Sequence, residues 1–256
     1  MYTPEIAERL RGEADQILAR YPEGHERSAL LPLLHLVQSE DGYVSADGIA
    51  FCADVLGLTR PEVSAVATFY TQYKRHPAGE YNVGVCTNAL CAVMGGDQIW
   101  EAVEGHLGVG ADETTPDGKI TLERLECNAA CDYAPVVMVN WEFFDNQTPE
   151  STIALVDDLT AGRDVKPTRG PNKLRTFKEI SHLLAGFEDG LVDEGPSAGE
   201  PSLRGLKLAQ EHGWTCPAPS DGAKAATDAG QEVGGLHSSA DRPAVTEEDQ
   251  EGDSND

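Results

Sequence analysis

Four of the six cysteines in this sequence stand in two short pairs, and their spacing constrains the fold more than any other feature. The pairs are Cys86-x4-Cys91 and Cys127-x3-Cys131, whereas Cys52 and Cys216 stand alone. An even number of cysteines in a short secreted chain would indicate disulfides. This chain has 256 residues, and disulfides are rare in a reducing cytosol. The pattern therefore predicts a metal or cluster site with two bystander cysteines.

Each pair directly follows a segment with the pattern of a β-strand. Residues 81–85 run into Cys86, and the alternating segment 119–126 runs into Cys127. A helical pattern at 96–107, a short apolar strand at 136–139 and a helix from Thr148 to about Gly162 complete this part. The order predicts an α/β layer, residues 79–165, with the four cysteines at the ends of its strands.

The residues before this layer have helical periodicity. Apolar residues recur at spacings of three and four in 4–20, an apolar run begins at Leu30, and a third helix is predicted over 46–56. Thr59 is followed by Pro61 and Glu62, the arrangement of a capping box at the start of a fourth helix. We therefore expect a small N-terminal helical bundle over residues 1–78.

Charge excludes two classes of partner. The chain has 44 acidic and 19 basic residues, a formal net charge of −25. Nucleic-acid binders and proteins that dock on anionic lipid need the opposite balance. Apolar runs fall short of the roughly 20 residues of a membrane span, and the first residues do not resemble a secretory signal. We expect a cytoplasmic chain with no nucleic-acid partner and no direct membrane insertion.

Much of this charge lies in the last quarter of the sequence. Residues 187–256 contain 16 acidic and 4 basic residues, ten glycines and two aromatic residues. A segment with low hydrophobicity and high net charge does not bury enough apolar surface to offset the entropy of ordering. We therefore predict a C-terminal extension, residues 166–256, that is largely disordered after about residue 186.

The ligand chemistry of four thiolates leaves several choices. Thiolates select zinc, copper(I) or an iron–sulfur cluster. Structural zinc sites favour two to four residues between paired ligands, so the four residues between Cys86 and Cys91 are at the upper end for zinc. A Cys-x4-Cys pair also occurs in plant-type [2Fe–2S] ferredoxins. Spacing alone favours iron–sulfur and leaves open a zinc site or a set of redox-active or merely buried thiols.

Other candidate residues have simpler interpretations. Cys52 is predicted to be a core residue and Cys216 a free thiol, and His35 and His76 lack ligand spacing. We predict that Phe69, Tyr70 and Tyr73 pack in the core; the alternative is that they face a partner. The glycines near the first pair form no dinucleotide fingerprint, and we find no pattern typical of nucleophilic catalysis. We therefore predict no catalytic residue in this chain.

Four motifs in order give the sequence a family resemblance. They are Val66–Tyr70, Val85–Gly96, Glu113–Lys119 and Glu126–Pro135. Together they resemble the small [2Fe–2S] subunit family of NADH–quinone oxidoreductase, bacterial respiratory complex I. The member of this family in bacteria is called the E subunit, and its mitochondrial counterpart is the 24-kDa subunit. The resemblance covers about residues 25–165.

The resemblance implies a fold and a function. Cys86, Cys91, Cys127 and Cys131 match the family's four cluster ligands. The implied fold is an N-terminal helical bundle followed by a thioredoxin-like [2Fe–2S] domain. The implied function is electron transfer: the cluster exchanges single electrons with the FMN of a partner that binds NADH, and quinone is reduced elsewhere in the complex. A further peripheral-arm iron–sulfur subunit is a second implied partner, and the complex would lie on the cytoplasmic side of the membrane.

Two points qualify this expectation. The family commonly has Leu-Gly where this sequence has Asn128 and Ala129, so Ala129 must tolerate any tight turn there. Similar proteins also serve as diaphorase subunits of NAD-linked hydrogenases and formate dehydrogenases. The flanking carboxylates Glu126 and Asp132 would keep the potential of a cluster low. A zinc-stabilised thioredoxin-like binding module and a free-standing ferredoxin are the competing hypotheses.

Overall fold

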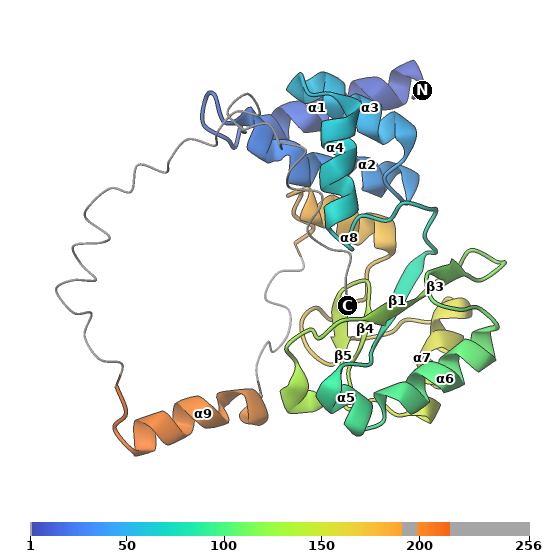
Figure 1. The fold of residues 1–256 in the computed structure, drawn as a ribbon, viewed down its shortest axis with the longest axis vertical. Helices are drawn as coiled ribbons and strands as arrows, with labels where there is room; N and C mark the ends of the chain where they lie inside the picture. The colour runs from blue at the N-terminus through green and yellow to red at the C-terminus, as the bar shows by residue number, and fades with distance from the viewer. Residues whose placement is uncertain (1, 191–198, 216–256) are drawn as a thin grey trace, which may run out of the picture. The chain divides into compact units, whose positions relative to one another are not determined.

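A computed structural model describes residues 2–190 and 199–215 (Figure 1). The described residues up to 204 form one compact unit, and those from 205 on belong to a second. The helices are α1 (Pro4–Leu18), η1 (Glu26–Ala29), α2 (Leu30–Asp41), α3 (Ala46–Leu56), α4 (Arg60–Phe69), α5 (Ala89–Val93), α6 (Gly96–Leu107), η2 (Cys131–Tyr133), α7 (Pro149–Thr160), α8 (Phe177–Leu184) and α9 (Glu200–Glu211). The strands are β1 (Tyr81–Cys86), β2 (Glu113–Thr114), β3 (Ile120–Leu125), β4 (Val137–Val139) and β5 (Glu142–Phe144).

Local sequence signals explain where the first helices begin and end. The Thr3 hydroxyl caps α1, and the Ser45 hydroxyl accepts a hydrogen bond from the Gly48 amide at the start of α3. Thr59 and Glu62 form the capping box predicted for α4. Left-handed glycines end α2 and α3. The predicted helices at 4–20 and 46–56 agree with α1 and α3.

One apolar core joins α1–α4, and α8 closes it. The fully buried side chains include Leu10, Leu33, Leu34 and Val63. The segment that follows the α/β layer returns to this core, where α8 packs on α2 and Ala185, just after α8, is buried. Sequence analysis missed α8, although Thr176 and Glu179 form a capping box at its start. Residues 166–186 are therefore part of the folded body.

His35 is a buried titratable side chain of this core. It is 8 % exposed, its ring lies 4.8 Å from that of Tyr73, and its Nδ1 has no hydrogen-bond partner among the described residues. Burial lowers the pKa of His35 to about 4. The folded state thus favours the neutral ring. Above the ordinary pKa of about 6.5 the ring is neutral in the folded and the unfolded chain alike, so the folded state has its full stability there. Stability is lost as the pH falls from that value towards 4.

Replacing His35 with phenylalanine should remove this pH dependence. We expect the free energy of unfolding of the native chain to fall between pH 7 and pH 4 by about 3 kcal/mol more than that of His35→Phe. Urea titrations at both pH values measure the difference, and other pH-dependent contributions cancel in the comparison. The exposed His25, changed to phenylalanine, is the control. Parallel pH profiles for the native chain and His35→Phe would show that buried His35 does not cause the loss of stability at low pH.

The sheet is mixed, with strand order β2-β3-β1-β4-β5. β1 and β3 are parallel, and α5 and α6 lie between them in the sequence. β4 pairs antiparallel with β1, and β5 pairs antiparallel with β4. The predicted strands at 81–85, 119–126 and 136–139 agree with β1, β3 and β4. The hairpin strand β5 was not predicted.

The two faces of the sheet pack against different parts of the fold. Val83 and Val85 of β1 and Val137 and Val139 of β4 are fully buried in a core shared with α6 and α7. Because successive strand residues point to opposite faces, Met138 turns the other way. It joins a third apolar cluster that contains Cys86 and Cys91. The cysteine loops therefore rest on the face opposite the valines.

The prediction that Phe69, Tyr70 and Tyr73, at and after the end of α4, pack in the core is wrong in two of three cases. Tyr73 is buried, as predicted, but Phe69 is 78 % exposed and Tyr70 43 % exposed. The buried stripe of α4 consists of Val63 and Ala67. Phe69 follows Ala67 by two residues, about 200° around a helix, and so lies on the solvent face.

The prediction that the chain is largely disordered after about residue 186 stays a prediction, but two short parts of this segment have a defined structure. Phe187 packs against the helical core, and residues 200–211 form α9. The average composition of a 70-residue segment conceals this short run of helix-forming residues with Leu203 and Leu206 three apart. Residues 191–198 and 216–256, including Cys216, lie outside the described residues. The predicted domain limits at 78/79 and 165/166 stay predictions. None of the described helices has the length and apolar character to cross a membrane.

Candidate metal centre

The parallel pair β1/β3 brings the two cysteine loops to the same edge of the sheet. Cys86, the last residue of β1, is in register with Leu125, the last residue of β3. Cys127 follows Leu125 by two residues. Two parallel strands end at the same edge, so loops separated in sequence leave the sheet side by side. The strand pairing therefore brings the Cys86 and Cys127 loops together.

All four cysteines line one small hollow, together with Asn128, Ala130 and Val136. Cys86 and Cys91 are each 3 % exposed, whereas Cys127 and Cys131 are exposed. The Cys127 and Cys131 sulfurs are 3.9 Å apart. Among the described residues, no three His, Cys, Asp or Glu side chains gather around a point that one metal ion could occupy. The sulfurs are thus presented as a buried pair and an exposed pair.

The first loop is held close to the sheet by α5 and α6. α5 carries Cys91, and α6 begins at Gly96, directly against the loop. A Cβ atom at Gly96 would lie 2.5 Å from the carbonyl oxygen of Cys86 and 2.9 Å from that of Cys91. Only glycine permits this approach of two backbone segments, so Gly96 fixes the distance between α6 and both buried cysteines.

The second loop turns sharply between its two cysteines. Ala129 has φ = 54°, in the left-handed region, and its amide donates a hydrogen bond to the Cys127 sulfur at 3.4 Å. Cys131 then opens η2. The turn thus aims a backbone N–H at a sulfur atom, as expected for a loop that holds a thiolate.

Replacing Ala129 with glycine should stabilise the protein. An L-residue in the left-handed region costs about 1–2 kcal/mol, and glycine avoids this penalty. After the greater backbone entropy of glycine in the unfolded chain is subtracted, we expect Ala129→Gly to raise the free energy of unfolding by about 1 kcal/mol. Urea titration measures it. Ala161→Gly is the matched control, because Ala161 has φ = −78° and should lose stability. A loss of stability in Ala129→Gly would show that the left-handed backbone conformation of Ala129 is not strained.

A hydrogen bond ties the two loops together. The Asn88 side-chain amide donates to a Glu126 carboxylate oxygen at 2.7 Å. Asn88 precedes α5, and Glu126 precedes Cys127. The bond therefore joins the first loop to the second beside the hollow.

Metal binding in the hollow must displace protons from the cysteine thiols. Burial raises the pKa of the Cys91 thiol to about 11. The neighbouring Cys127 sulfur raises the pKa of Cys131. Metals bind the thiolate form, so metal binding at such thiols releases protons. The donor set of four sulfurs, with an N–H directed at one of them, fits an iron–sulfur group.

The other sequence candidates lie elsewhere. Cys52 is fully buried in the helical core, as predicted, and burial raises the pKa of its thiol to about 12. His35 belongs to the same helical region, and the exposed His76 is not among the residues that line the cysteine hollow.

Sequence analysis missed one residue that braces the second loop. The Arg169 guanidinium lies over the rings of Tyr133 and Phe143, 5.1 and 4.3 Å from their centroids. It also pairs with Asp145 at 2.7 Å. Arg169 thus connects η2 to β5. No local pattern predicts it, because Arg169 and Tyr133 are distant in sequence and meet only in the fold.

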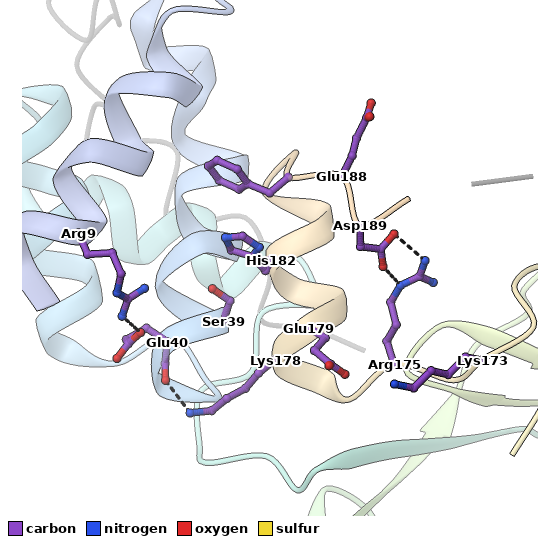
Figure 2. A pocket seen from close by; sticks show the side chains of 11 residues that line it. Arg9, Ser39, Glu40, Lys173, Arg175, Lys178, Glu179, His182, Glu188 and Asp189 are labelled. Atoms are coloured by element: carbon purple, nitrogen blue, oxygen red, sulfur yellow. Dashed lines mark hydrogen bonds and ion pairs between the residues drawn. The ribbon is translucent and has the colours of Figure 1, made fainter. Parts of the chain in front are cut away.

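A second hollow lies where α8 meets α1 and α2 (Figure 2). Its charged side chains mostly face one another. Arg9 pairs with Glu40, and the Lys178 ammonium donates to the Glu40 carbonyl at 2.6 Å. Arg175 forms a two-pronged ion pair with Asp189. We interpret this hollow as a salt-bridged joint that anchors α8.

Comparison with known proteins extends this picture. Residues 14–160 match the model of the thioredoxin-like [2Fe-2S] ferredoxin family. The chain is 58 % identical over 223 residues, 87 % of each chain, to the E subunit of the NADH-quinone oxidoreductase of Mycobacterium bovis. It is 35 % identical over 160 residues, 62 % of this chain and 88 % of the relative, to NADH-quinone oxidoreductase subunit 2 of Thermus thermophilus. A solved NAD+-reducing [NiFe]-hydrogenase is similar with TM-score 0.48 and 20 % identity, over 52 % of this chain and 23 % of that chain.

The family model covers more than half of the sequence and contains both cysteine loops. The match to the mycobacterial E subunit extends over most of both chains. The resemblance drawn from four short motifs is thereby confirmed. This chain belongs to the thioredoxin-like [2Fe–2S] ferredoxin family, together with the E subunits of NADH–quinone oxidoreductases.

Proposed function

We propose that this chain is the iron–sulfur electron-transfer subunit of an NADH–quinone oxidoreductase, with Cys86, Cys91, Cys127 and Cys131 as the ligands of one [2Fe–2S] cluster. The observation that carries the proposal is the convergence of these four cysteines on one hollow. The relatives, which are subunits of NADH–quinone oxidoreductases, indicate the enzyme. When bound, a [2Fe–2S] group stores and releases one electron at a time.

The two pairs of cysteines have different tasks in this proposal. Cys86 and Cys91 are held below the surface against the sheet, and they anchor the group in apolar surroundings. Cys127 and Cys131 are exposed and bring the site close to the surface. A site near the surface allows an electron to pass to or from a docked partner.

NADH gives up a hydride, so a flavin must stand between NADH and a one-electron carrier. The sequence has no dinucleotide fingerprint after a strand. We therefore place FMN and NADH on a partner subunit of the complex. A further iron–sulfur subunit and the quinone site belong to other parts of the same membrane-bound complex, on the cytoplasmic side of the membrane.

The surface beside the first loop supports docking of the flavin subunit. Leu90, Val93 and Met94, in and just after α5, are 45 %, 83 % and 56 % exposed. All three lie within three residues of Cys91. Exposed apolar clusters are typical of protein interfaces. A partner seated on α5 would therefore lie next to the electron-transfer site.

The test is copurification of the complex through a tag on this chain. We expect a flavin subunit to copurify, and NADH to generate the EPR signal of the reduced [2Fe–2S] cluster in the complex. Val93→Glu should release the partner, whereas Leu184→Glu, at an exposed apolar residue of α8, should retain it. Copurification of hydrogenase or formate dehydrogenase subunits would contradict the assignment to NADH–quinone oxidoreductase. A chain that elutes alone, with a cluster that NADH does not reduce, would also contradict it.

A further inference from the structure

The second cysteine loop contains a side-chain amide nitrogen that is buried and has no hydrogen-bond partner among the described residues. This nitrogen, Asn128 Nδ2, is inaccessible to solvent, and no group in residues 2–190 or 199–215 bonds to it. Asn128 lines the same hollow as the four cysteines. An unsatisfied buried donor destabilises the folded state, so such groups in native proteins call for an explanation. The location of Asn128 points to an acceptor within the hollow.

The acceptors that this hollow gathers are sulfur atoms. The neighbouring amide, that of Ala129, already donates to the Cys127 sulfur at 3.4 Å. The left-handed turn at Ala129 and the side chain of Asn128 thus present two consecutive donors. The unpartnered atom is the amide nitrogen, which is the donor end of the side chain.

We propose that Asn128 donates its side-chain N–H to a sulfur of the bound [2Fe–2S] group and thereby raises its reduction potential. The inference rests on the proposed function. Reduction adds one negative charge, and a hydrogen-bond donor stabilises the more negative form. Asn128 thus acts against the nearby carboxylates of Glu126 and Asp132, which disfavour added negative charge. Asn128 tunes the reduction potential through this hydrogen bond and is not one of the ligands.

Three variants at this position separate donation from packing. Leucine has a similar volume and no donor. Aspartate keeps the shape and replaces the donor with an oxygen. Glutamine keeps the amide on a longer side chain. The measurement is a redox titration of the full-length chain with its cluster, followed by EPR, with iron and acid-labile sulfide determined for each protein.

We expect Asn128→Leu to shift the one-electron equilibrium at least tenfold against reduction, which is about 59 mV. Asn128→Asp should shift it further in the same direction, and Asn128→Gln should recover part of the native potential. If Asn128→Leu does not retain its cluster, Asn128→Ala decides the question, because alanine removes the donor without adding charge or bulk.

Two results would overturn the inference, and they differ from each other. An Asn128→Leu protein with full iron and sulfide content and the native midpoint potential would show that Asn128 does not donate to the group. The proposed function would then stand. A native chain without labile sulfide would overturn both the inference and the proposed function. The native iron and sulfide analysis therefore comes first.

Discussion

Cys127→Ser is expected to lose the visible absorption and the EPR signal of the [2Fe–2S] cluster. Cys127 stands at the carboxyl edge of β3, next to the end of β1, and its sulfur accepts a hydrogen bond from the Ala129 amide. Serine keeps the shape of the side chain but has a hydroxyl that does not ionise at neutral pH. The same loss is expected for Cys86→Ser, because the group requires sulfur donors from both loops.

Cys52→Ser is the matched control for these variants. Cys52 is as buried as Cys86 but lies in the helical core, away from the hollow. We expect its iron and sulfide content to equal that of the native chain, with some loss of stability from the buried hydroxyl. Cys216→Ser should likewise keep the cluster. A native cluster spectrum in Cys127→Ala would refute the ligand assignment.

The largest loss of stability is expected for Arg175→Met. The Arg175 side chain is 7 % exposed and pairs with two carboxylates, Asp189 and Glu142. Its backbone carbonyl also accepts a hydrogen bond from the Asn140 side-chain amide at 2.8 Å. Partial burial raises the pKa of Glu142, and removal of the guanidinium would leave this half-buried carboxylate without its cation. Removing one partner of a buried ion pair costs about 3–5 kcal/mol, and we expect a loss of that size.

Arg163→Met provides the comparison, measured by urea unfolding under the same conditions. The Arg163 and Asp158 side chains form an ion pair but are 58 % and 44 % exposed. Exposed pairs contribute about 1 kcal/mol or less. Similar small losses in both variants would show that Arg175 does not hold the segment after α8 to β5.

The candidate site was predictable because its signals are local. Each cysteine pair directly follows a strand, and the alternation of residues in 119–126 is visible in the sequence. The start of α4 was predictable for the same reason, from the capping box of Thr59 and Glu62. The sequence indicated that Ala129 must tolerate any tight turn in this loop, and the positive φ of Ala129 places the turn at this residue.

The remaining features depend on contacts between distant segments. α8 has its own capping box, but the acidic, glycine-rich residues that follow it conceal the signal, and its position against α2 follows from tertiary packing. The stacking of Arg169 on Tyr133 has no sequence pattern. Phe69 was misplaced because aromatic residues were assumed to be buried, whereas the helical phase of α4 turns it to solvent.

The most direct test of the account is the metal and sulfide content of the full-length chain, purified without oxygen and without its partners. The account predicts about two iron atoms and two acid-labile sulfides per chain, a red-brown colour and a [2Fe–2S] EPR signal on reduction. A colourless protein that contains zinc, has no labile sulfide and gives no EPR signal would contradict the central claim.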